Sequence, residues 1–190
     1  AGAISLRDEP RASARGTLDR LRGFGLAPLV MMTGDGRATA QAIAAEVGID
    51  EVHAELTPDE KLALVRWLEE ERPTVFVGDG VNDAPALAAA SVGVAMAAAG
   101  ADVAMETADV ALMGADLHRL ADAVELARAT RRRTIESLVF ALSVIAVVAP
   151  LGAMGFATLW VAVLLHEGST VLVVLNGLRL LGFRPADRAG

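Results

Sequence analysis

The feature that most limits how this chain can fold is a long run without charge. No residue from Ser137 to Leu165 is charged. A membrane-spanning helix rises about 1.5 Å per residue and needs about 20 residues, so the run is long for one span and short for two. A proline and two glycines near its middle (Pro150, Gly152 and Gly155) predict a tight turn. We therefore expect a hairpin of two transmembrane helices, the second from about Thr158 to Leu181.

The arginines around this hairpin predict its orientation. Arg131–Arg133 precede the first span, Arg179 and Arg184 end or follow the second, and the turn between them is uncharged. Because cytoplasmic flanks of membrane helices are enriched in Lys and Arg, both ends of the hairpin are expected to face the cytosol. A buried helical hairpin in a soluble protein is the alternative, and the length and uniform apolarity of the run argue against it.

The first 116 residues have a different pattern, in which short apolar runs alternate with amphipathic stretches. This alternation predicts an α/β fold with a parallel sheet covered by helices. Helical patterns include Thr17–Arg22 and Ala38–Val47, with Gly48 as a stop, and a long helix is expected over Asp116–Arg133. The predicted strands are Ala3–Leu6, Leu29–Thr33, Thr74–Gly78, Val92–Met96 and Asp109–Met113.

A third helix in this region has the clearest start signal. Thr57 can cap it, Pro58 can be its first residue, and Glu60 can return a hydrogen bond to form a capping box. Lys61 then stands near the helix N-terminus, where a cation is unfavourable against the helix dipole unless an anion offsets it. This position is consistent with a phosphate partner, although a lone lysine on a helix is more often solvated.

Charge and composition exclude several classes of function. The net charge is −7 and no basic stripe is present, which argues against a nucleic-acid partner. The chain has no cysteine, so it has neither disulfides nor thiolate metal ligands. Its first residues, Ala1–Leu6, do not form a signal peptide. They begin in an expected strand without an initiator Met, which suggests that the chain is a fragment.

The segment Val75–Leu87 carries the most chemistry. An apolar strand runs into Gly78-Asp79-Gly80, and Asn82, Asp83 and the start of a helix follow. Glycines let the backbone bend sharply, so Asp79 and Asp83 can converge at one edge of the sheet. Two carboxylates and an amide are hard oxygen ligands that suit Mg²⁺ beside a phosphoryl group. A capped surface turn with solvated aspartates is the plainer interpretation of Gly-Asp-Gly alone.

The full string from Val75 to Leu87 resembles the hinge motif of P-type ATPases, within the haloacid-dehalogenase-like fold. Met32-Thr33-Gly34-Asp35 resembles the family's Thr-Gly-Asp loop, which helps hold the phosphoryl group, and Thr57–Lys61 resembles the segment whose lysine neutralises it. Gly100–Asp109 is similar to the stretch after the hinge motif, although Ala101 stands where the family often has threonine. The resemblance implies a phosphorylation domain in which Thr33, Gly34, Asp35 and Lys61 serve catalysis and Asp79, Gly80, Asn82 and Asp83 bind Mg²⁺ and phosphate.

The family's nucleophile is missing from this chain. It is the first residue of an Asp-Lys-Thr-Gly-Thr string, which does not occur here. A carboxylate nucleophile splits phosphoryl transfer into formation and hydrolysis of an acyl phosphate, so the fragment is expected to be inactive alone. The resemblance also implies that ATP binds mainly to a domain absent here.

An ionisable pair interrupts the second expected span. His166 lies eight residues after Thr158, about 12 Å along a helix and near mid-membrane, and Glu167 follows it. Charged groups at that depth indicate function by default, although plain hydrogen bonding to neighbouring helices is the alternative. Imidazole and carboxylate suit Zn²⁺ or Co²⁺ better than Cu⁺. Gly168 could permit unwinding that turns both toward one ion, and Thr170 could add a hydroxyl.

The string His166-Glu167-Gly168-Ser169-Thr170 resembles the last-helix motif of pumps associated with cobalt and zinc. The whole pattern is thus similar to the C-terminal part of a heavy-metal-transporting P-type ATPase in a bacterial plasma membrane. It implies part of a phosphorylation domain (1–116), a stalk helix (117–133), two transmembrane helices (134–183) and a tail (184–190). Expected partners are the rest of the pump, the metal ion and the bilayer.

Two other classes remain open at this point. A membrane-anchored phosphatase of the dehalogenase-like fold requires an aspartate nucleophile within the chain. Asp35 follows a strand but lacks a partner acid two residues on. A non-catalytic accessory protein requires only metal binding by His166 and Glu167, without ATP turnover.

Overall fold

The computed structural model describes residues 13–78, 81–97, 106–114, 116–156 and 158–185. The chain divides into two compact units, one ending at Ala121 and the other beginning at Asp122. The helices and strands, in order, are α1 (Ala14–Gly23), β1 (Val30–Met32), α2 (Arg37–Val47), β2 (Glu51–His53), α3 (Pro58–Glu71), β3 (Val75–Gly78), η1 (Val81–Asp83), α4 (Ala84–Ala89), β4 (Val92–Ala97), β5 (Val110–Met113), α6 (His118–Ala153), α7 (Leu159–Leu178) and η2 (Arg179–Gly182).

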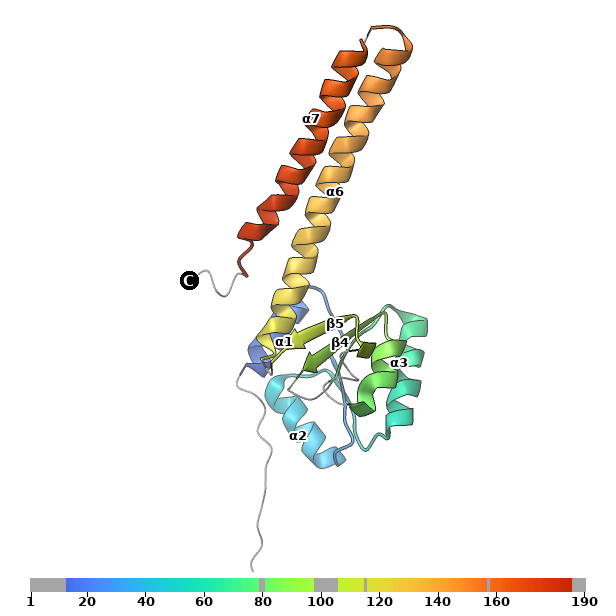
Figure 1. Cartoon of the computed structure of the whole chain (residues 1–190). Coiled ribbons are helices and arrows are strands. Elements are labelled where there is room, and N and C mark those ends of the chain that lie inside the picture. Colours follow the sequence, from blue (N-terminus) through green and yellow to red (C-terminus); the bar gives the residue numbers. More distant parts are fainter. Residues whose placement is uncertain (1–12, 79–80, 98–105, 115, 157, 186–190) are drawn as a thin grey trace, which may run out of the picture. The chain divides into compact units, whose positions relative to one another are not determined.

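Parallel strands form the centre of the first unit (Figure 1). β1 pairs with β2 in one sheet, and β3, β4 and β5 pair in that order in another. Val30 stands opposite Glu51 in the first sheet, while Val75 stands opposite Val92 and Val94 opposite Val110 in the second. All of these pairs are parallel, as the alternation of apolar and amphipathic segments predicts. The α/β fold class expected from the sequence is confirmed.

The two sheets meet a common hydrophobic core. Val65 of α3, Phe76 of β3, Leu87 of α4 and Ala95 of β4 are all buried in one cluster with Ala86. Met32, the last residue of β1, packs against this cluster. The end of β1 is therefore held close to the second sheet, although the described strands of the two sheets do not pair with each other.

Helix ends in this unit follow the local signals in the sequence. Thr57 caps α3: its side chain accepts a hydrogen bond from the backbone N–H of Glu60, and the Glu60 carboxylate accepts one from the backbone N–H of Thr57, so the predicted capping box is present. α2 ends at Gly48, which has a φ of 79°, a left-handed conformation that favours glycine. The predicted start of α3 and end of α2 are both confirmed.

Strand prediction was less complete. The predicted strands at residues 29–33, 74–78, 92–96 and 109–113 correspond to β1, β3, β4 and β5, whereas Ala3–Leu6 lies outside the described residues. β2 was not predicted, because Glu51-Val52-His53 is short and has only one apolar residue. Its place beside β1 is instead supported by backbone hydrogen bonds from Asp50 and Glu51 to the carbonyl of Leu29.

A carboxylate at the end of α3 joins the starts of two strands. Glu69 Oε1 accepts hydrogen bonds from the backbone N–H of Thr74 (2.6 Å) and of Ser91 (2.7 Å), and Oε2 accepts one from Ser91 Oγ (2.7 Å). The Ser91 contacts lead in holding the pKa of Glu69 below its usual value, and the Thr74 contacts add to the effect. Glu69 thus fixes β3 and β4 relative to α3.

The second unit is a pair of long helices. α6 and the stretch from Trp160 to Gly182 are each long and apolar enough to cross a membrane, and they lie side by side in Figure 1. Many of their large apolar side chains are exposed, for example Phe156 at 78% and Trp160 at 82%, as expected for surfaces that contact lipid or other membrane helices. The predicted turn is present, since α6 ends at Ala153 and Gly155 has a φ of 77°.

A polar contact ties the two membrane helices together. Asn176 Nδ2 of α7 donates hydrogen bonds to Ser137 Oγ (3.1 Å) and to the carbonyl of Arg133 (3.4 Å). Ser137 and Asn176 therefore pack between the two helices. Ser143 behaves differently, because its hydroxyl donates to the carbonyl of Val139 on its own helix.

Two glycines should respond in opposite ways to replacement by alanine. A Cβ at Gly93 would lie 2.5 Å from the carbonyl oxygen of Leu87, whereas a Cβ at Gly16 in α1 would meet nothing within 4 Å. Gly93→Ala should lower the free energy of unfolding by about 1–3 kcal/mol through overpacking. Gly16→Ala should raise it by about 0.5–1 kcal/mol because alanine is the better helix former. Denaturant unfolding followed by circular dichroism measures both, and equal shifts would contradict the packing argument.

The Glu69 contacts predict a pH dependence. Because the folded state holds the pKa of this carboxyl below its unfolded value, its stabilisation is present above the unfolded pKa and is lost as pH falls through the folded pKa. Glu69→Gln should therefore flatten the loss of thermal stability between neutral and acidic pH. Glu70→Gln, on the same helix and exposed, is the matched control. A Glu69→Gln profile that parallels wild type would show that the contacts are unimportant.

Candidate functional site

Thr33 lies directly after the carboxyl end of β1. Its backbone N–H continues the hydrogen bonding between β1 and β2, because it donates to the carbonyl of His53 at 3.0 Å. Its hydroxyl donates to Asp35 Oδ2 at 2.8 Å and accepts from the Asp35 backbone N–H at 3.1 Å. The Thr33-Gly34-Asp35 loop is thus a turn closed on itself, with its polar groups at the edge of the sheet where parallel α/β folds bind ligands.

This loop is also attached to the segment that leads into α3. The backbone N–H of Leu56 donates to the carbonyl of Thr33 at 3.0 Å, and that of Glu55 donates to the carbonyl of Asp35 at 2.9 Å. A Cβ at Gly34 would lie 3.4 Å from the carbonyl oxygen of Leu56, so the two backbones run close together. The approach positions the Thr33 loop beside the N-terminus of the helix that carries Lys61.

Lys61 has an anionic partner within the chain. Its Nζ donates to Asp83 Oδ1 at 2.9 Å, and the two side chains are only 19% and 13% exposed. The backbone N–H of Lys61 donates to the carbonyl of the N-cap residue Thr57, so the lysine belongs to the first turn of α3. In the described structure the carboxylate of Asp83 offsets this cation against the helix dipole, whereas the sequence led us to expect a phosphate partner, which stays a prediction.

The end of β3 sets the position of Asp83. The strand ends at Gly78 and the short helix η1 brings the chain back, so that a Cβ at Gly78 would lie 2.8 Å from the Cβ of Asp83. Only a residue without a side chain permits this approach. The sequence predicts a bend at this glycine, and the structure shows that the glycine also makes room for Asp83. Asn82 is exposed in η1, and Asp79 and Gly80 lie outside the described residues.

The predicted residues therefore form two contact pairs in the described part of the chain. One is Thr33 with Asp35, the other Lys61 with Asp83, and the backbone contacts of residues 55 and 56 link the loops that carry them. Among the described side chains, no hydrogen bond joins the first pair to the second. The arrangement places the Thr33 hydroxyl and the Asp35 carboxylate after the carboxyl end of β1, the Asp83 carboxylate after β3, and the Lys61 cation in the first turn of α3.

These groups match the chemistry of magnesium and a phosphoryl group in part. Asp83 offers a carboxylate with one oxygen engaged by Lys61 and the other directed towards Gly78. Mg²⁺ prefers oxygen ligands and keeps several waters, so one carboxylate can serve as one of few protein ligands. An ammonium next to it suits a phosphate oxygen.

The membrane pair lies on α7. His166 and Glu167 both line a hollow of about 370 Å³, together with apolar side chains of both helices, namely Val144, Ile145, Val148, Ala149, Ala162 and Val163. α7 is continuous from Leu159 to Leu178, so the unwinding at Gly168 that the sequence analysis considered is absent. The two side chains reach one hollow without it.

The two hydroxyl side chains that follow His166 and Glu167, those of Ser169 and Thr170, donate hydrogen bonds to the helix backbone. Ser169 Oγ and Thr170 Oγ1 both donate to the carbonyl of His166, at 2.7 and 3.1 Å. Thr170 thus shares a face with His166, as the helical spacing predicts, and its oxygen lone pairs are available. Among the described residues, no group of three or more His, Cys, Asp or Glu side chains is arranged to hold a metal, so the pair is at most part of a metal site.

The Lys61–Asp83 pair should be sensitive to the loss of either partner. Lys61→Met or Asp83→Asn leaves one charge poorly solvated, and each should lower the free energy of unfolding by about 1–3 kcal/mol. The double variant should lose less than the sum, and a double-mutant cycle by denaturant unfolding measures the difference. Arg66→Gln, exposed on the same helix, is the control. Strict additivity of the two single variants would show that the ion pair does not form in solution.

Comparison with known proteins identifies the same two parts. A family model described as haloacid dehalogenase-like hydrolase matches residues 1–91. The probable cation-transporting ATPase G of Mycobacterium tuberculosis is 50% identical over 184 residues, 97% of this chain and 24% of that protein. A probable cadmium-transporting ATPase of Alkalihalophilus pseudofirmus is 46% identical over 179 residues, 94% of this chain and 25% of that protein. The chain spans about a quarter of the length of these curated relatives.

Solved structures agree with the sequence relatives. A crystal structure of a zinc-transporting PIB-type ATPase aligns with a TM-score of 0.85 and 41% identity, over 92% of this chain and 28% of that one. A second crystal structure of a zinc-transporting PIB-type ATPase, in a different state, aligns with a TM-score of 0.81 and 40% identity over the same shares. The alignment includes both the dehalogenase-like domain and the long apolar helices. Over nearly its whole length the chain therefore matches a segment of the heavy-metal-transporting P-type ATPases, the segment that joins a dehalogenase-like domain to two transmembrane helices.

Proposed function

We propose that this chain is the C-terminal part of an ATP-driven efflux pump for a divalent heavy metal such as Zn²⁺, Co²⁺ or Cd²⁺. The observation that carries the proposal is the close Lys61–Asp83 pair, which is largely shielded from solvent, together with the hydrogen bonds that residues 55 and 56, just before the helix of Lys61, make to the Thr33 loop. Relatives that are 44–50% identical are described as cation- and cadmium-transporting ATPases.

In this proposal the soluble part handles a phosphoryl group. Lys61 neutralises phosphate oxygens, and the backbone and hydroxyl of the Thr33-Gly34-Asp35 loop position the group. Asp83, with Asp79, binds Mg²⁺, which supplies positive charge against the oxygens of the transferring group. Lys61 and Asp83 contact each other in the described structure. On binding of phosphate and Mg²⁺, this ion pair would be replaced by a contact between Lys61 and the phosphate and a contact between Asp83 and Mg²⁺. Asn82 and Gly80 support the hinge next to these groups.

The phosphorylated aspartate comes from outside this chain. Within the described residues β1 pairs only with β2, and β3 only with β4, so each has one unpaired edge. Met32 of β1 nevertheless packs on the core that contains Phe76 of β3. An unpaired strand edge can pair with a further strand. The rest of the pump is proposed to provide that strand, and the strand is proposed to carry the phosphorylated aspartate. ATP would bind mainly to a separate domain, and the chain alone would be inactive.

The membrane part is proposed to contact the cargo. His166 and Glu167 share one hollow in the helix pair, and an imidazole with a carboxylate is a ligand set suited to Zn²⁺ and related ions. Thr170 is the third proposed contact. Since these residues supply too few ligands for a complete site, the other membrane helices of the pump must provide the remainder. The soluble part would lie in the cytoplasm of a bacterial cell, because arginines flank both free ends of the hairpin.

The proposal is tested in the complete natural protein that contains this chain. Purified and reconstituted, it should hydrolyse ATP faster with Zn²⁺, Co²⁺ or Cd²⁺ than without. Asp83→Asn should lower turnover by about 100-fold or more, the scale for loss of one transition-state contact. His166→Ala should remove metal stimulation while phosphorylation from inorganic phosphate persists, since the soluble site is untouched.

Arg66→Gln serves as the control and should retain metal-stimulated turnover. Turnover that is indifferent to every divalent transition metal would rule out the transport assignment. Normal metal stimulation in His166→Ala would instead remove only the membrane site from the proposal. The absence of ATP hydrolysis in every natural assembly would favour a non-catalytic accessory role.

A further inference from the structure

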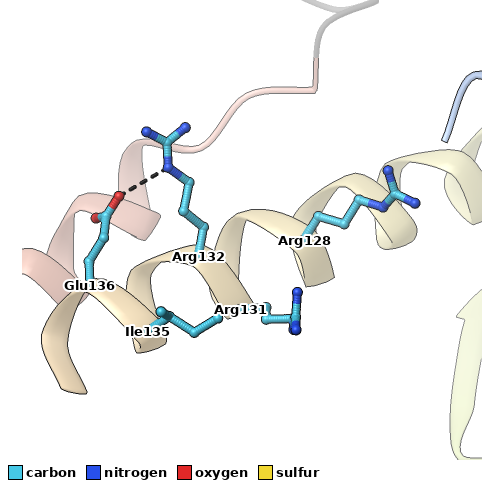
Figure 2. Close-up of a pocket in the computed structure, with 5 residues that line it drawn as sticks. All are labelled: Arg128, Arg131, Arg132, Ile135 and Glu136. Carbon is cyan, nitrogen blue, oxygen red and sulfur yellow. Dashed lines mark hydrogen bonds and ion pairs between the residues drawn. The ribbon is translucent and has the colours of Figure 1, made fainter. Parts of the chain in front are cut away.

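A second hollow, of about 670 Å³, lies on α6 outside both proposed sites. Three arginines, Arg128, Arg131 and Arg132, line it together with Ile135 and Glu136. Figure 2 shows the three guanidinium groups extending from this stretch of α6, with Glu136 beside Arg132. Residues three and four apart share one side of a helix, which is why these arginines surround a common space.

Positive charge in this hollow exceeds the negative charge that faces it. Glu136 accepts from Arg132 Nε at 3.0 Å and from Arg133 Nη1 at 2.8 Å, so two guanidinium groups share one carboxylate. From residue 122 to 136 the sequence has four arginines (Arg128, Arg131, Arg132 and Arg133) and three acids (Asp122, Glu125 and Glu136). Arg131 is exposed, and the described residues offer it no ion-pair partner. The hollow therefore favours an anion that this unit does not itself provide.

The position along the helix indicates which anion. Ser137, the first residue of the uncharged run, follows Glu136 directly. Arg132 precedes Ser137 by five residues, or about 7.5 Å along the helix, and the headgroup layer on each side of a bilayer is about 5–8 Å thick. Arg132 thus stands at headgroup depth when the uncharged run fills the hydrocarbon core, and Arg131 lies about 1.5 Å further out, while Arg128 is about 13.5 Å from Ser137 on the aqueous side of that layer. Ile135, 44% exposed, lies between the arginines and that core.

We propose that Arg128, Arg131 and Arg132 bind the phosphodiester headgroup of an anionic phospholipid. Guanidinium groups form paired hydrogen bonds with phosphate oxygens, and Ile135 contacts the apolar part of the same lipid. The ligand is a lipid rather than free phosphate, because an apolar side chain lines the hollow and the hydrocarbon-spanning run begins beside it. This site is separate from the phosphoryl site and the metal pair, so it does not depend on the pump mechanism.

The test measures lipid retained by the complete chain. The chain is incubated in mild detergent with equal amounts of phosphatidylglycerol and phosphatidylcholine, and bound lipid is counted by native mass spectrometry. Wild type should retain phosphatidylglycerol preferentially. Arg131→Gln should reduce that retention about fivefold, the scale for one arginine at an anionic surface, and Arg128→Gln/Arg131→Gln/Arg132→Gln should reduce it further. Arg66→Gln, which removes an exposed arginine from the soluble unit, should have no effect.

Three outcomes would overturn the proposal. Equal retention of the two lipids by wild type would show that the headgroup charge is not recognised. Unchanged retention in Arg131→Gln and in the triple variant, with helix content by circular dichroism as in wild type, would exclude these arginines. Displacement of phosphatidylglycerol by excess glycerol phosphate would show that the site takes a soluble phosphate instead. A salt titration of wild type tests the proposal even if a variant misfolds. Retention of phosphatidylglycerol should fall as ionic strength rises, because salt screens the charge of the arginines. Constant retention would contradict the proposal.

Discussion

The ion pair between Lys61 and Asp83 connects the folding of the soluble unit to its chemistry. Removing two charges from water is costly and is offset only by good geometry. That geometry depends on the capping box that begins α3, on the close approach of Gly78 to Asp83, and on the core that packs α3 against β3. Each of these contacts could stabilise any α/β domain. Together they hold a cation and a carboxylate in contact, as the proposed handling of a phosphoryl group and Mg²⁺ requires.

The surfaces of the two units are suited to different environments. In the soluble unit the sheets and helices bury Val65, Phe76 and Leu87 among themselves. In the helical unit the large apolar side chains remain exposed, and the described contacts between the helices include the polar Asn176–Ser137 hydrogen bond. Such a surface is stable only in lipid or against other apolar helices. The arginines from 128 to 133 lie between the residues suited to water and those suited to lipid. At the same position their positive charge could bind an anionic headgroup.

Local signals explain how much of the fold could be predicted. The ends of α2 and α3 depend on Gly48 and on Thr57 with Glu60, all close in sequence, and both ends were predicted correctly. The hairpin turn near Gly155 and the uncharged run were equally visible, because lipid allows few charged side chains in a span. β2 was missed because Glu51-Val52-His53 has a weak strand pattern. Its pairing with β1 stabilises the strand, and that pairing cannot be seen within the three residues themselves.

The residue types that can handle phosphate, magnesium and a transition metal were evident from the order of amino acids, because chemistry follows from the side chain and from its neighbours along the chain. Their partners were not evident. Lys61 and Asp83 are 22 residues apart, and His166 and Glu167 point about 100° apart on a helix, yet the first two share a hydrogen bond and the second two share a hollow. Such contacts are set by how helices and strands pack, since packing brings together groups that no local pattern relates.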